Sequence, residues 1–154
     1  MSALALAIHS LVAIIWVGGM FFAYMILRPS MPVLEPPPQR LKLWLAVFER
    51  FFPWVWGAVI ALPVTGYYQV FTDYGGLDGT GPHIHLMQAG AGVMILLFWY
   101  LYFGPYAGFK AAVSTEDWPT AAGHLNTIRR IVGTNLILGL ITAAAGASGR
   151  LWML

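Results

Sequence analysis

The 154-residue chain has no cysteine and few charged residues. The lack of thiols excludes disulfides, thiolate metal sites, iron–sulfur clusters and cysteine catalysis, so any metal must be held by histidine, methionine or oxygen. Charged residues make up 9% of the chain and apolar residues 59%, and the mean hydropathy is +0.72. Ordinary soluble domains carry about a quarter charged residues. The composition therefore excludes a water-soluble globular protein and predicts that the chain lies in the hydrocarbon of a membrane.

Motifs of several soluble protein classes are also missing. The eight Lys and Arg residues are scattered singly, and the net charge is only +2, so no basic stripe suggests nucleic-acid binding. Neither a Ser-His-Asp set nor a phosphate-binding glycine loop in a βαβ context is apparent. We therefore expect no nucleic-acid partner and neither hydrolase nor kinase activity.

Four apolar runs reach the length of a membrane span. They cover residues 3–27, 51–70, 84–104 and 131–148. The first run is too long for the core of a signal peptide, so we expect it to be retained as a span. The sequence predicts an all-α fold, an integral membrane four-helix up-down-up-down bundle that forms one domain, residues 1–154, in the lipid bilayer.

The positive charges predict the orientation of this bundle. Seven of the eight cations lie between spans one and two or between spans three and four, namely Arg28, Arg40, Lys42, Arg50, Lys110, Arg129 and Arg130. The positive-inside rule then places both termini outside the cytoplasm, which in a bacterium means the periplasmic side of the inner membrane. Trp44, Trp99 and Tyr100 are expected in the aromatic belt at the cytoplasmic interface.

Two histidines are expected at matching depths near the periplasmic end. His9 lies early in span one and His85 at the start of span three, so each is within roughly 5–8 Å of the start of its helix at a rise of about 1.5 Å per residue. Spans one and three run in the same direction and would be diagonal partners around one cavity. An ionisable group within a span is a functional candidate by default.

This arrangement suits one haem b, bound by a neutral imidazole on each side of the iron. Ala89 and Gly92 follow His85 at i+4 and i+7, and Ala13 follows His9 at i+4, so small residues could lie beside a porphyrin. Arg150 is the one periplasmic cation and the candidate partner for the haem propionates, or else a simple interfacial anchor.

The same region also suits copper, because imidazole and thioether groups bind that metal well. His9, His83, His85 and Met87 form the candidate cluster, in which His83 and Met87 share one helix face at i and i+4. His83 lies about 200° around the helix from His85, so both can hardly bind one iron. The sequence leaves open which of the two is the second haem ligand.

Several of these stretches resemble a known family. The segment HSLVAIIWVGGMFFAY at residues 9–24, the pair Arg28-Pro29, HIHLM at residues 83–87 and IRRIVGTNLILG at residues 128–139 resemble the CopD-type (copper resistance protein D) membrane family. The HemJ-type protoporphyrinogen oxidases, which bind haem b, share a similar opening that includes a match to His9. They carry a lysine where this chain has His85.

The CopD resemblance implies copper uptake or resistance at the bacterial inner membrane. The histidine pattern itself favours a haem protein that passes electrons at the periplasmic face, a possible membrane oxidoreductase with a quinol or a periplasmic redox partner. A third hypothesis is an accessory subunit of a larger membrane complex. An oligomer is compatible with all three.

Overall fold

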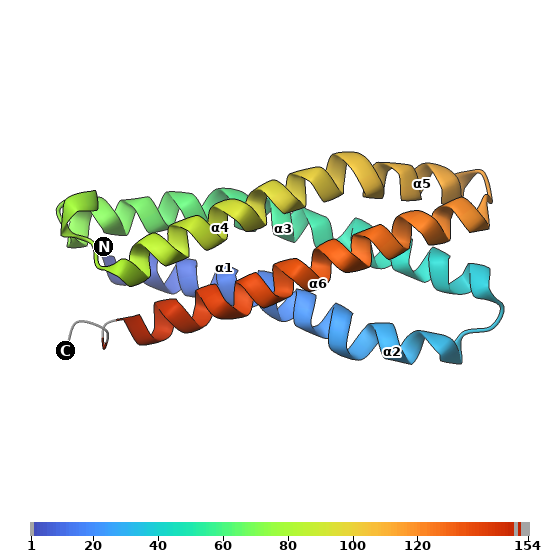
Figure 1. Ribbon diagram of the computed structural model, residues 1–154, viewed down its shortest axis with the longest axis horizontal. Helices are drawn as coiled ribbons and strands as arrows, with labels where there is room; N and C mark the ends of the chain where they lie inside the picture. The colour runs from blue at the N-terminus through green and yellow to red at the C-terminus, as the bar shows by residue number, and fades with distance from the viewer. Residues whose placement is uncertain (1, 150, 152–154) are drawn as a thin grey trace.

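The computed structural model describes residues 2–149 and 151, and it consists of helices joined by short turns. Consecutive long helices run in opposite directions along one bundle (Figure 1). The elements in chain order are α1 (Ser2–Phe21), the π-helix η1 (Phe22–Leu27), α2 (Arg28–Ser30), the 3-10 turn η2 (Met31–Val33), α3 (Pro37–Asp73), the 3-10 turn η3 (Leu77–Gly79), α4 (Pro82–Leu101), the π-helix η4 (Tyr102–Tyr106), α5 (Ala107–Ser114) and α6 (Trp118–Ser148). The predicted all-α architecture is confirmed.

Four continuous helical stretches are long and apolar enough to cross a membrane: Ala3–Val33, Pro37–Asp73, Pro82–Ser114 and Trp118–Ser148. Most of their surface is not covered by the rest of the chain. Lipid can cover such surface and leaves no backbone group unpaired, because a helix satisfies its own hydrogen bonds. The chain is therefore a multi-pass membrane protein.

The helices continue well beyond the predicted spans at the cation-rich end. The 37 residues of α3 extend about 55 Å, whereas the hydrocarbon core of a bilayer is about 30 Å thick. Residues 37–50 and 118–130 are too polar to be recognised as spans, but they are helical because they pack on one another and on α5. Leu41, Leu125 and Phe109 are buried at this contact.

The helices pack mainly as two antiparallel pairs. α1 lies along α3, and α4 lies along α6, while α1 also contacts α6. Gly19 lets α1 approach α3 closely, because a Cβ at that position would overlap the Phe51 ring. Gly90 of α4 likewise lies against the Thr142 side chain of α6. Small residues at these contacts are typical of helix packing in membranes.

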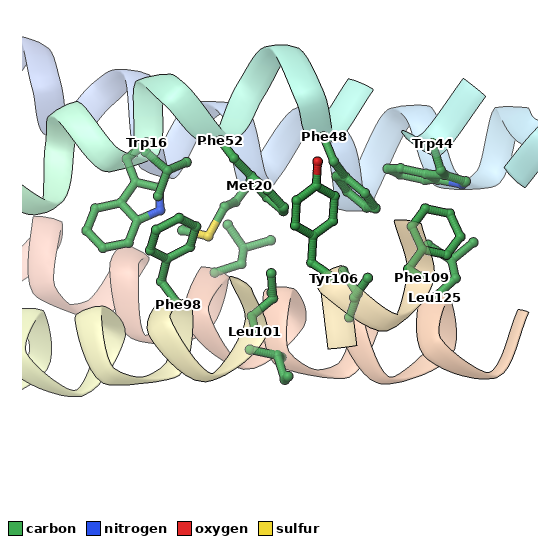
Figure 2. Close-up of a cluster of buried hydrophobic side chains, with 14 of the residues drawn as sticks. Trp16, Met20, Trp44, Phe48, Phe52, Phe98, Leu101, Tyr106, Phe109 and Leu125 are labelled. Carbon is green, nitrogen blue, oxygen red and sulfur yellow. The ribbon is translucent and has the colours of Figure 1, made fainter. Parts of the chain in front are cut away.

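A cluster of aromatic rings joins the two pairs at the cation-rich end (Figure 2). Phe48 and Phe52 stack with ring centroids 5.1 Å apart, and Tyr106 meets Phe52 edge-on at 4.7 Å. Phe98 also contacts Phe52 edge-on, at 5.7 Å. Trp44 stacks on Phe48 and is only 3% exposed. The prediction that Trp44 lies in an interfacial belt is therefore wrong, because the continued helices enclose it.

The turn before α6 is closed by Asp117, whose carboxylate accepts a hydrogen bond from the Thr120 backbone N–H at 3.2 Å. Hydrogen bonds from the Thr120 side chain and backbone hold the pKa of Asp117 below its ordinary value. The carboxylate therefore stabilises the start of α6 at neutral pH, and this contribution is lost as the pH falls through that lowered pKa.

We expect the aromatic cluster to dominate the stability of the bundle. Replacing Phe52 by alanine removes a ring that is 4% exposed and touches Phe48, Phe98 and Tyr106. The expected loss is about 3–5 kcal/mol, measured as a lower thermal midpoint of the protein in detergent. Phe103→Ala is the matched control, because Phe103 is 68% exposed. Equal midpoints for the two variants would contradict this prediction.

Candidate functional site

The end of the bundle where α1 and α4 begin contains three of the four histidines. His9 lies on α1, half-buried, with its ring against α3. A Cβ added at Gly66 of α3 would lie 3.3 Å from His9 Cε1, so the glycine makes room for the imidazole. His9 Nδ1 lies 2.9 Å from the Thr65 hydroxyl oxygen. The ring is thus held by the neighbouring helix.

The hydrogen bonds of the Thr65 hydroxyl indicate which ring nitrogen of His9 carries the hydrogen. This hydroxyl has one hydrogen, and it donates that hydrogen to the Ala61 carbonyl at 2.6 Å. The contact with His9 must then be a hydrogen bond that Nδ1–H donates to Thr65. The lone pair of the neutral ring consequently lies on Nε2. Metal-binding histidines are typically oriented in this way, with the other ring nitrogen donating to a fixed partner.

His85 is held by a second threonine in the same manner. Its Nε2 lies 3.2 Å from the Thr80 hydroxyl oxygen, and Thr80 donates to the Leu77 carbonyl at 2.6 Å. The lone pair of the His85 ring is therefore on Nδ1. His85 itself is exposed. The turn that connects α3 to α4 thus supplies the residue that orients this imidazole.

His83 and Met87 lie on the opposite face of α4, which packs on α6. His83 is 3% exposed, and its ring rests on Gly149, where a Cβ would overlap it. One turn further along α4, the Met87 sulfur would lie 3.1 Å from a Cβ at Gly146. The predicted shared face is confirmed by these two contacts. An imidazole and a thioether therefore lie in one row above the glycines of α6.

The remaining candidates lie on α1 and α4. Ala13 is half-buried on α1, whereas Ala89 and Gly92 are exposed on the same side of α4 as His85. No hydrogen bond joins His9 to His85 among residues 2–149, and no group of three or more His, Asp or Glu residues is arranged for a metal ion there. Arg150, the candidate propionate partner, lies outside the described residues.

Thr65 and Thr80, which assign the two tautomers, were not predicted from the sequence as site residues. Their role depends on which residues of different helices or turns lie side by side, and no local pattern carries that information. A second polar group was also missed. Trp44, Arg129 and Asn135 line a cavity toward the other end of the bundle, where the sequence predicts only an interfacial aromatic belt.

The chain matches a known protein family. The family described as copper resistance protein D (CopD) matches residues 45–148, more than half of the chain. No curated protein and no solved structure was found to match. The matched region contains His83, His85 and Met87 together with α4, α5 and α6. The chain therefore belongs to the copper resistance protein D family.

Proposed function

We propose that this protein binds copper as cargo at the end of the bundle where α1 and α4 begin, with the His83 imidazole and the Met87 thioether as its main ligands. The row that these two side chains form above Gly149 and Gly146 is the observation that carries the proposal. Membership of the copper resistance protein D family supports it.

The chemistry of the two side chains favours the reduced ion. Thioether sulfur is a soft ligand that selects Cu(I), and imidazole also binds copper well. Residues at i and i+4 lie on one helix face with their Cβ atoms about 5–6 Å apart, so both side chains can reach one ion. A site with few ligands also allows the ion to leave, which suits a protein that passes copper on.

The imidazoles of His9 and His85 are further ligands near the same end. The contacts with Thr65 and Thr80 occupy one ring nitrogen of each histidine, which leaves the other nitrogen of each ring for a metal ion. They are the candidates for additional copper ligands at this end of the bundle.

The haem b hypothesis for His9 and His85 stays a prediction. The Nε2 lone pair of His9 suits it. His85, in contrast, offers Nδ1, which lies close to its own Cβ. A flat macrocycle bound at this nitrogen would collide with the helix more readily than a small ion would. A sharp b-type band in the reduced-minus-oxidised spectrum of the purified protein would favour haem, and with it electron transfer with a quinol or a periplasmic partner.

Replacing Met87 by leucine tests the copper site with little change in side-chain volume. We expect the affinity for Cu(I), measured by competition with a chromogenic chelator, to fall about tenfold or more because the sulfur ligand is lost. Met94→Leu is the matched control, since Met94 lies on the same helix, is 3% exposed and packs near Gly139. An unchanged affinity in Met87→Leu would rule out this ligand set.

We further propose that the histidine end faces away from the cytoplasm, because the cations gather at the opposite end. The chain has no cysteine, so single cysteines report topology cleanly. In intact cells, a membrane-impermeant maleimide should label the variant Asp78→Cys in η3, and it should label Ser114→Cys only after permeabilisation. The reverse pattern would invert the proposed orientation.

A further inference from the structure

A cavity of about 40 Å³ lies at the cation-rich end of the bundle, between α1, α3 and α6. Most of the cavity surface is apolar, and the lining residues with polar side-chain atoms are Tyr24, Arg28, Trp44, Arg129 and Asn135. Phe48 and Phe52 of the aromatic cluster (Figure 2) are among its apolar lining residues. About 10–15 Å³ of such volume holds one water molecule, so the space fits a few water-sized atoms or one compact polar group.

Two buried hydrogen-bond donors in this lining lack partners within the chain as described. They are Nε1 of Trp44 and Nε of Arg129. The Trp44 side chain is 3% exposed, and the guanidinium of Arg129 lies over its ring at 5.9 Å. Buried donors are nearly always paired in native proteins, because leaving them unpaired is costly. The two N–H groups therefore require an acceptor that the described residues do not supply.

The charge of the lining indicates what kind of acceptor this is. Arg28 and Arg129 both line the cavity, and neither is ion-paired with a carboxylate among the described residues. The ion pairs at this end instead join Lys42 to Glu116 and Lys110 to Glu49. Two guanidinium groups beside one cavity repel each other in a medium of low dielectric constant. A bound anion would offset both charges.

We propose that this cavity binds a compact oxyanion, namely the phosphate of an acidic lipid headgroup or free inorganic phosphate. Trp44 Nε1–H and Arg129 Nε–H donate to its oxygens. Arg28, which is exposed and rests on the Tyr24 ring at 5.0 Å, closes the site from the surface. Guanidinium groups pair with phosphate through strong, charge-assisted hydrogen bonds.

Asn135 marks the inner limit of this site. It follows Arg129 by six residues on α6 and so lies about 9 Å further along the helix. Its Nδ2 donates to the Met94 carbonyl at 3.2 Å, and its Oδ1, an acceptor, is buried without a hydrogen-bond partner among the described residues. An acceptor repels an anion, so the phosphate is held at the arginine end.

The test compares two neighbouring arginines in the full-length, delipidated protein. Arg129 lines the cavity, whereas Arg130 is exposed, and glutamine at either position removes one positive charge. In nanodiscs and by native mass spectrometry, we expect the unmodified protein to retain phosphatidylglycerol over phosphatidylcholine. Arg129→Gln should weaken this binding about tenfold, which corresponds to about 1.4 kcal/mol, while Arg130→Gln should leave it nearly unchanged. Equal losses in the two variants would overturn the proposal in favour of surface charge.

Trp44→Phe removes the indole N–H and keeps an aromatic ring against Phe48, so it tests the second donor separately. We expect weaker anion binding with an unchanged far-ultraviolet circular dichroism spectrum and elution volume. Inorganic phosphate is titrated in parallel. Thermal stabilisation by phosphate, and its displacement of the lipid, would identify free phosphate as the ligand, whereas lipid retention without a phosphate effect would identify the headgroup. Preference for neither anion would overturn the proposal.

Discussion

The stacking of Phe48 on Phe52, with Phe98 and Tyr106 edge-on, is the interaction on which the rest of the bundle depends. Lipid is as apolar as a leucine side chain, so helices in a bilayer gain little from the hydrophobic effect and associate through close packing. These rings concentrate that packing at one end of the molecule. The other end has glycines at its helix contacts and contains three histidines, and His83 and Met87 there pack against Gly149 and Gly146.

The helices could be predicted from the sequence because their signal is local. Apolar runs of spanning length show where helices cross the membrane, and i to i+4 spacing was enough to put His83 and Met87 on one face. The contacts between helices could not be predicted in this way. That His9 meets Thr65 on α3, and that His83 rests on Gly149, depends on how far one helix is shifted along another.

Burial was the second limit on prediction from the sequence. Trp44 lies among charged residues and so has the local pattern of an interfacial tryptophan, yet the continuation of α3 and α6 beyond the apolar runs encloses it. The same enclosure brings Arg129 over its ring. Tyr24, Arg28, Arg129 and Asn135 all come from the stretches that resemble the CopD family, and they line one cavity. Stretches that are far apart in the sequence thus come together around this cavity.

The length of α3 has a consequence for how the protein responds to its surroundings. About 25 Å of this helix exceeds the hydrocarbon thickness, so one molecule is immersed in two solvents. Urea acts from water, so it first reaches the part of the bundle that extends beyond the bilayer. Bilayer thickness and acyl-chain composition act on the part within the hydrocarbon core. Unfolding by chaotrope and unfolding by harsh detergent would therefore begin at opposite ends of the same bundle.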